Sequence, residues 1–329
     1  MKTQMKALQV VEPRRFAQVQ AIIPDLETAG PDRILVQPEW VSMCGSDIPF
    51  FTGSKRHKSY PLPVGKPIHE CVGKVVESNS SLFQPGDRVI TIPEEDQGLA
   101  EYFVAKDAKA AKLPADLDDN GTSCLIQPLS TVINALDRLG DIEGKSVAVV
   151  GLGSIGLFFC WLLKKRGATR IVGIDPLEER CRAATGMGAT DCLAARSLEV
   201  LHDARQYSGS WDAPDIIIEA VGHQMDTLND CLGLVRQEGT VLAFGVPDHL
   251  VYALEYETFF RKNAILMACV TPKWSEYLAI SRDVFLSARE QLEPLVTHRF
   301  PIRDAGQAFS TYEKHADGIL KALIDMSDW

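Results

Sequence analysis

The feature that most constrains the fold is a glycine-rich segment that directly follows a buried apolar run. Val147-Ala148-Val149-Val150 is continuous and apolar, as expected for a strand covered on both faces. Gly151-Leu152-Gly153-Ser154-Ile155-Gly156 comes next and opens a stretch with helical spacing over residues 154–166, which Gly167 is expected to end. A strand, a glycine turn and a helix in this order predict the first unit of a parallel α/β sheet.

The same alternation continues toward residue 270. Apolar runs at 171–174, 215–218 and 240–244 alternate with helical patterns at 177–185 and 225–236. This predicts a doubly wound parallel sheet of the Rossmann type, with helices on both faces. Residues 1 to about 125 instead hold short apolar runs bounded by Pro, Gly, Asn or Asp, which indicate a β-rich region. The predicted fold class is therefore α/β with a second, β-rich part.

The glycine segment predicts a dinucleotide site. Gly151 would make the tight turn, Gly153 would admit a pyrophosphate against bare backbone, and Gly156 would let helix and strand pack closely. The helix start at Ser154 and Ile155 would offer free N–H groups and positive potential to the phosphates.

Asp175 closes the next strand about 20 residues later, where a carboxylate can bind an adenosine ribose. It would repel a 2′-phosphate, so NAD is favoured over NADP. Arg180 could stack on adenine, and a solvated helix residue is the alternative.

A second group of chemistry-bearing residues precedes the glycine segment. Cys44, His69 and Glu70 offer a thiolate, an imidazole and a carboxylate, the donors of a catalytic zinc site that keeps one position open. Such an ion would stabilise an alkoxide, and Ser46 could carry the alcohol proton toward solvent. Spacing alone leaves a buried thiol and a satisfied histidine as the alternative.

Composition narrows the classes of function. The chain has 329 residues, enough for two domains, and its net charge of −10 disfavours a nucleic-acid binder. It has no apolar run long enough to span a membrane. The eight cysteines are scattered, which is typical of reduced thiols, so we expect a cytoplasmic protein.

The order and spacing of these motifs resemble those of the zinc-dependent medium-chain alcohol and polyol dehydrogenases over essentially the whole chain. The resemblance implies a GroES-like catalytic domain of residues 1–128 and 270–329 and a Rossmann domain of residues 129–269, with the active site in the cleft. The residues that carry it are Cys44-Gly45-Ser46-Asp47, His69-Glu70 followed by Gly73, Pro85-Gly86-Asp87-Arg88-Val89, Gln127-Pro128-Leu129, the glycine segment, Asp175, Ala220-Val221-Gly222 and Phe244-Gly245-Val246.

The resemblance also implies roles for single residues. Cys44 and His69 would be zinc ligands, Glu70 a ligand or a nearby carboxylate, and Ser46 the start of the proton relay. Lys321 would approach the pyrophosphate and Arg299 the cofactor, although either could be a surface charge. The residues implied to face the nicotinamide are Thr131, Val221, Gly222, Phe244 and Gly245.

Four departures from the family pattern bear on the chemistry. Gln127 stands where a Glu or Cys is usual, and its amide oxygen would be a weaker, uncharged zinc ligand. Ile68 replaces a glycine, and Pro49 replaces the histidine that continues the proton relay in many relatives. The four-cysteine lobe is missing, because residues 91–100 contain no cysteine. We therefore expect one catalytic zinc at most and no structural zinc.

The sequence thus predicts hydride transfer between NAD and a secondary alcohol, such as a polyol, sugar or sugar derivative, or its ketone. A zinc-free reductase of quinones or activated alkenes and a non-catalytic NAD-binding protein are the alternatives. Lys55-Arg56-His57-Lys58 could attract an anionic substrate or be a solvated loop. The apolar run at 264–270 predicts a homodimer through paired edge strands, with a tetramer as the alternative.

Overall fold

The structure, a computed structural model, describes residues 3–54, 59–117 and 120–329. The chain forms two compact units, one of Met1–Thr131 with Pro272–Trp329 and the other of Val132–Thr271. The boundary between the units at Thr131 and Val132 lies inside helix α3 (Ile126–Leu139). The domain limits predicted from the sequence, 128/129 and 269/270, stay predictions beside this division. None of the described helices is long and apolar enough to cross a membrane.

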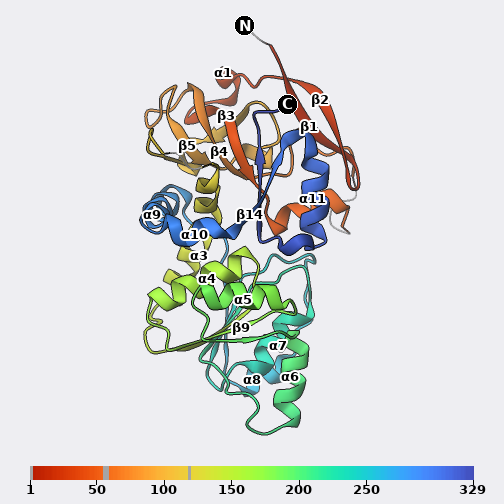
Figure 1. Cartoon of the computed structure of the whole chain (residues 1–329), viewed down its shortest axis with the longest axis vertical. Coiled ribbons are helices and arrows are strands. Elements are labelled where there is room, and N and C mark those ends of the chain that lie inside the picture. The colour runs from red at the N-terminus through yellow and green to blue at the C-terminus, as the bar shows by residue number, and fades with distance from the viewer. Residues whose placement is uncertain (1–2, 55–58, 118–119) are drawn as a thin grey trace. The chain divides into compact units, whose positions relative to one another are not determined.

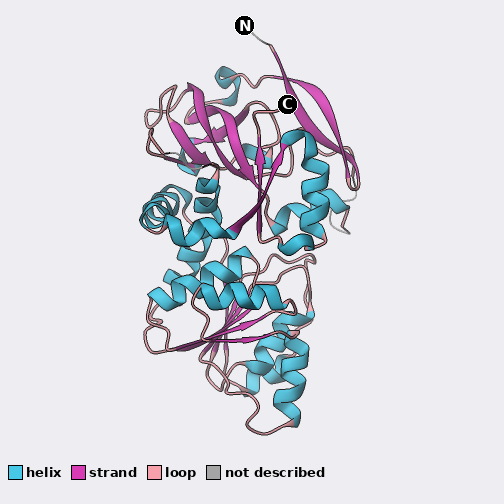
Figure 2. Cartoon of the chain, viewed as in Figure 1, coloured by secondary structure: helices cyan, strands magenta, loops and turns pink. Residues whose placement is uncertain are grey.

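The second unit is built on a parallel sheet whose strands run in the order β10-β9-β8-β11-β12-β13. Helices cover both faces of this sheet (Figures 1 and 2), which confirms the predicted α/β fold class. The strands are β8 (Ser146–Val150), β9 (Arg170–Ile174), β10 (Asp191–Leu193), β11 (Ile216–Glu219), β12 (Thr240–Ala243) and β13 (Ile265–Ala268), and the helices are α4 (Ser154–Lys165), α5 (Glu178–Gly186), α6 (Ser197–Gln206), α7 (Asp226–Leu234) and α8 (Tyr256–Arg261).

The order of the strands reverses at β8. The chain runs outward from β8 through β9 to β10, and then returns to the other side of β8 at β11. In open α/β sheets, ligands bind beyond the carboxyl ends of the strands at such a switch point. The glycine segment follows β8 directly, and Gly167 has the left-handed φ of +80° expected where α4 ends.

A set of polar contacts fixes the start of β8 against β11. The Asp215 carboxylate, just before β11, accepts hydrogen bonds from Ser146 N and Oγ at 2.8 Å and from Arg236 Nε at 2.7 Å. Partial burial alone would raise the pKa of Asp215, but these hydrogen bonds outweigh it and lower the pKa to about 2.

The low pKa of Asp215 makes its contribution to stability depend on pH. We expect Asp215→Asn to lower the free energy of unfolding by about 1 kcal/mol at neutral pH, after discounting for solvent screening. A folded-state pKa below the ordinary 3.8 stabilises the fold above that value, and the gain disappears as pH falls toward about 2. Urea unfolding of both proteins over this range measures the difference, and a gap that does not shrink on acidification would contradict the assignment.

The first unit contains a hairpin and a mixed sheet. Among the described residues, the sheet order is β14-β15-β3-β4-β5-β7, with β6 also paired to β3. The C-terminal strand β15 lies antiparallel to β3, so the end of the chain completes a sheet begun near its start (Figure 1). The strands are β1 (Gln4–Glu12) and β2 (Arg15–Ile22) of the hairpin, and β3 (Arg33–Ser42), β4 (Glu70–Ser78), β5 (Arg88–Thr91), β6 (Phe103–Lys106), β7 (Ala110–Lys112), β14 (Val296–Pro301) and β15 (Lys321–Asp325).

Helices of four to 14 residues complete this unit. A buried core that includes Phe51, Ile68 and Phe309 lies between the sheet and helix α11. This arrangement confirms the β-rich first part predicted from the sequence. The helices are α1 (Leu26–Ala29), α2 (Ile48–Thr52), α9 (Trp274–Ser287), α10 (Arg289–Leu292) and α11 (Ala305–Glu313).

Candidate metal and dinucleotide sites

Strand register brings the candidate metal ligands together. In the antiparallel pair β3–β4, Ser42 lies opposite Glu70. Cys44 follows the end of β3 and His69 precedes the start of β4, so both residues lie at the same end of this strand pair. Residues distant in sequence therefore become neighbours because two antiparallel strands end together.

The resulting group fits a single cation. One ligand atom from each of Cys44, His69 and Glu70 lies within 4.8 Å of the other two. Zinc binds Cys sulfur at about 2.3 Å and His nitrogen at about 2.0–2.1 Å, so atoms this close can share one ion. Cys44 and His69 are half-buried and Glu70 is buried, which leaves one side of the group accessible. The donor set of sulfur, nitrogen and oxygen is the kind that zinc prefers.

Asp47 is a supporting residue that the sequence prediction did not assign to the site. It is buried in the 3-10 turn η1 (Gly45–Asp47), its Oδ1 lies 3.0 Å from His69 Nδ1, and its Oδ2 accepts the Cys44 backbone N–H at 2.8 Å. One carboxylate thus contacts both candidate ligands and leaves the other imidazole nitrogen, Nε2, as a possible donor to a metal ion. Burial alone would lower the pKa of His69, but Asp47 and, to a smaller extent, Cys44 raise it well above the ordinary value.

Changing Asp47 to asparagine should weaken the metal site without removing a ligand. We expect the affinity for zinc to fall about tenfold to a hundredfold, as for other residues that orient metal-bound histidines. The neutral amide of the D47N variant cannot supply the negative charge that holds the imidazole N–H. Competition with a fluorescent zinc chelator measures the change, and unchanged affinity in a folded D47N protein would rule out this role.

Glu70 has a second partner from the end of the chain. Lys321 Nζ lies 2.9 Å from one carboxylate oxygen of Glu70 and 2.6 Å from the other, and both side chains are buried. Burial alone would lower the pKa of Lys321, but Glu70 beside it raises the pKa. The structure therefore places Lys321 in an ion pair with a residue of the candidate metal site, whereas its contact with a pyrophosphate stays a prediction.

The other predicted residues of this unit lie in different settings. Ser46 is half-buried in η1, and among the described residues its hydroxyl has no hydrogen-bond partner. Gln127 and Thr131 lie on α3, where Gln127 is buried and Thr131 Oγ1 donates to Pro128 O at 2.7 Å. Arg299, on β14, is exposed, and its Nε donates to Asn120 O at 3.3 Å. Their roles stay predictions, and Lys55-Arg56-His57-Lys58 lie outside the described residues.

The glycine loop of the second unit has the close contacts that a dinucleotide site requires. Gly151 has a φ of +91°, and a Cβ on Gly156 would lie 1.9 Å from Gly151 O. A Cβ on Gly153 would meet no atom within 4 Å, so the space in front of this residue is open. Buried Ser154 and half-buried Ile155 begin α4, whose N-terminus points its free N–H groups out of the loop. The loop therefore fits a pyrophosphate against Gly153.

Asp175 holds this loop in place. Its Oδ2 accepts the Leu152 N–H at 2.9 Å, and its Oδ1 accepts the Leu177 N–H at 3.0 Å. Arg180 Nη1 lies 3.5 Å from Asp175 Oδ2, so Arg180 pairs with the carboxylate that was predicted to bind ribose. Adenine stacking by Arg180 and ribose binding by Asp175 stay predictions.

Two further loops leave the carboxyl ends of β11 and β12. Val221 and Gly222 follow β11, and the Glu219 carboxylate accepts both of their N–H groups at 3.0 Å. Gly245 follows β12, and a Cβ there would lie 2.2 Å from Gly222 N, so the two loops pack backbone against backbone. Phe244 is buried, and its ring centroid lies 5.0 Å from that of Phe159. The contact of these loop residues with a nicotinamide stays a prediction. Glu219 was not predicted from the sequence, because nothing in a strand pattern marks a carboxylate that binds loop amides.

Comparisons with known proteins show which families the two parts of the chain match. Residues 30–115 match the alcohol dehydrogenase GroES-like domain, and residues 154–283 match the zinc-binding dehydrogenase family. The sorbitol dehydrogenase of Ovis aries is 29% identical over 342 residues, covering 91% of each chain.

Solved structures agree in fold. Alcohol dehydrogenase TADH from Thermus sp. ATN1 superposes with a TM-score of 0.81 and 24% identity, covering 98% of this chain and 100% of that one. A protein of Sinorhizobium meliloti 1021, described as a zinc-binding dehydrogenase and solved with NADP, gives a TM-score of 0.79 and 23% identity over 99% and 100% of the two chains. With two family matches in the expected order, the chain belongs to the zinc-dependent medium-chain dehydrogenase/reductase family.

Proposed function

We propose that this protein is a zinc-assisted, NAD-dependent dehydrogenase of a secondary alcohol. The observation that carries the proposal is the convergence of Cys44, His69 and Glu70 ligand atoms within 4.8 Å of one another. A thiolate, an imidazole and a carboxylate at that spacing suit a Lewis-acid ion better than they suit structural packing. The glycine loop after β8 supports a bound dinucleotide as the hydride acceptor or donor.

The residues of the candidate metal site would have separate roles in alcohol oxidation. Zinc held by Cys44, His69 and Glu70 would supply Lewis-acid polarisation of an alcohol oxygen. Ser46, whose hydroxyl is unpaired among the described residues, would accept the alcohol proton. Pro49 cannot carry that proton further, so we propose that Ser46 passes it to water or to a cofactor ribose hydroxyl. The carbinol hydride would move to the nicotinamide.

Asp175 supports NAD as the cofactor. Its carboxylate is fixed by two backbone N–H groups and lies at the end of β9, where a ribose 2′-phosphate would meet negative charge. The relative from Sinorhizobium meliloti holds NADP, so kinetics with both cofactors are the test. A kcat/KM for NADP equal to that for NAD would contradict the preference.

A polyol, sugar or sugar derivative, or the matching ketone, is the substrate we propose. Similarity to a sorbitol dehydrogenase supports this class. The decisive experiment combines elemental analysis of the purified protein with NAD turnover on a panel of polyols and simple alcohols. One zinc per chain and zinc-dependent turnover are expected. A protein without bound zinc would favour a reductase of quinones or activated alkenes, and cofactor binding without any turnover would favour a non-catalytic role.

We further propose a homodimer formed through β13. This edge strand pairs only with β12 among the described strands, and Ile265 and Leu266 on it are 54% and 36% exposed. An exposed apolar edge invites pairing with a second copy of itself. Ile265→Lys should shift the protein toward the monomer in light scattering, and a tetramer would show as twice the dimer mass.

A cytoplasmic location stays a proposal, supported by eight free cysteines.

A further inference from the structure

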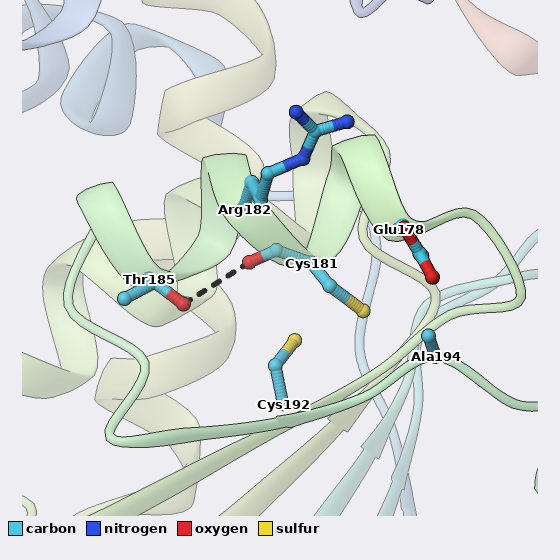
Figure 3. A pocket seen from close by; sticks show the side chains of 6 residues that line it. All are labelled: Glu178, Cys181, Arg182, Thr185, Cys192 and Ala194. Carbon is cyan, nitrogen blue, oxygen red and sulfur yellow. Dashed lines mark hydrogen bonds between the residues drawn. The ribbon is translucent and has the colours of Figure 1, made fainter.

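Two thiols of the second unit face each other across a hollow that the proposed function does not use. The hollow has a volume of about 280 Å³ and lies between α5 and β10. Figure 3 shows the sulfurs of Cys181, on α5, and Cys192, on β10, in the space between helix and strand, with the sulfur of Cys192 pointing toward the helix. Cys181 is a near neighbour that contributes to the raised pKa of the Cys192 thiol. The residues that line the hollow are Glu178, Cys181, Arg182, Thr185, Cys192 and Ala194.

The pair differs from the other cysteines in being both close and accessible. Cys192 is half-buried at the hollow, whereas Cys181 is 7% exposed behind it. An accessible thiol with a second thiol on the same hollow is an arrangement in which oxidation of the first can be resolved by the second. Burial raises the pKa of Cys192, with Cys181, Cys160 and Asp175 adding to the effect, so this thiol is protonated at neutral pH.

The pair is coupled to the dinucleotide loop through Asp175. Cys181 Sγ lies 3.6 Å from Asp175 O, to which it donates. The Asp175 side chain in turn holds Leu152 N in the glycine segment and Leu177 N before α5. A bond from Cys181 to Cys192 would remove the thiol donor and fix α5 to an edge strand of only three residues.

We propose that Cys181 and Cys192 form a reversible intrachain disulfide on exposure to hydroperoxides, and that this disulfide weakens dinucleotide binding. The Cys192 thiol loses its proton as its sulfur attacks the peroxide: an S–O bond forms, the O–O bond breaks, and the leaving oxygen takes up a proton to depart as an alcohol or water. Cys181 sulfur then attacks the sulfenic sulfur, forming the S–S bond as water leaves. Two thiols are oxidised, one hydroperoxide is reduced, and a dithiol reductant reverses the change. The effect on affinity rests on the proposed function, but the formation of the disulfide does not.

Peptide mapping of the zinc-loaded full-length protein tests the disulfide. After treatment with hydrogen peroxide at mildly alkaline pH, where more thiolate is present, trypsin should release Cys181-Arg182 linked to Ala183–Arg196. The link should vanish with dithiothreitol and be missing from Cys181→Ser and Cys192→Ser, which serve as matched controls. A dithiol-specific trivalent arsenical, added to the reduced folded protein, should protect both thiols together. Failure of both reagents to engage the pair in folded protein would overturn the proposal.

Fluorescence titration with NADH tests the consequence. The oxidised protein should bind NADH about fivefold or more weakly than the reduced protein, and reduction should restore the affinity. The two serine variants should keep the reduced affinity in peroxide. A linked protein with unchanged affinity would overturn the coupling to the cofactor site. Reduced protein that binds neither NADH nor NADPH would count against the proposed function, while peptide mapping would still decide the disulfide.

Discussion

Cys44→Ala is expected to lower kcat/KM for the alcohol substrate by about a thousandfold or more, because several kcal/mol of charge stabilisation depend on the metal. The variant loses the only sulfur donor in the group formed with His69 and Glu70. Its zinc content should fall well below one ion per chain. The dinucleotide Kd should stay close to the wild-type value, because the glycine loop belongs to the other unit. Steady-state kinetics, elemental analysis and NADH fluorescence measure these three quantities.

A variant at a second cysteine is the control that distinguishes loss of a zinc ligand from loss of any thiol. Cys192→Ser changes a half-buried thiol in the second unit and, in reducing buffer, should retain wild-type zinc content and kinetics. If C44A protein kept both full activity and a full complement of zinc, the assignment of Cys44 as a ligand would be wrong.

Gly156→Ala is expected to have the second largest effect. Its Cβ would lie 1.9 Å from Gly151 O, a backbone atom that cannot move without displacing the loop. We expect a loss of about 3 kcal/mol in the free energy of unfolding together with loss of dinucleotide binding. Urea denaturation and NADH titration measure the two effects separately.

Gly153→Ala should separate binding from stability. A Cβ at this position meets no protein atom within 4 Å, so the free energy of unfolding should change by less than about 0.5 kcal/mol. The methyl group would occupy the space proposed for the pyrophosphate, and the dinucleotide Kd should rise about tenfold or more. Gly186→Ala, also with open space around it, is the control and should leave both quantities near wild type. Wild-type affinity in G153A would contradict the placement of the pyrophosphate.

The hydrophobic periodicity of the sequence was sufficient to predict most strands and helices of the Rossmann unit. Continuous apolar runs such as 147–150 and 171–174 mark strands buried on both faces, and each is followed by a helical pattern that the structure contains. Strand β10 has only three residues, Asp191–Leu193, of which two are exposed, so neither period nor hydrophobicity marks it. The polar helix α6 was missed for a similar reason, because only three of its ten residues are buried.

The candidate metal site was predictable in its ligands but not in its supporting groups. Cys44, His69 and Glu70 carry donor chemistry that a sequence displays directly. Asp47 depends on the shape of a 3-10 turn, which sets its two oxygens against His69 and a backbone N–H. The pairing of Lys321 with Glu70 depends on β15 lying beside β3, and local patterns contain no information on that long-range register.

The position of β15 late in the sequence also sets the time at which the sheet of the first unit can finish folding during synthesis. Residues 132–271 are contiguous and can fold as a unit while translation continues. The Trp40–Ser42 part of β3 must wait for its partner Leu323–Asp325, which is synthesised after all of the second unit. A chain that stops before β15 would therefore carry a finished nucleotide fold but an unfinished candidate cation site, with Glu70 lacking its buried counter-ion Lys321.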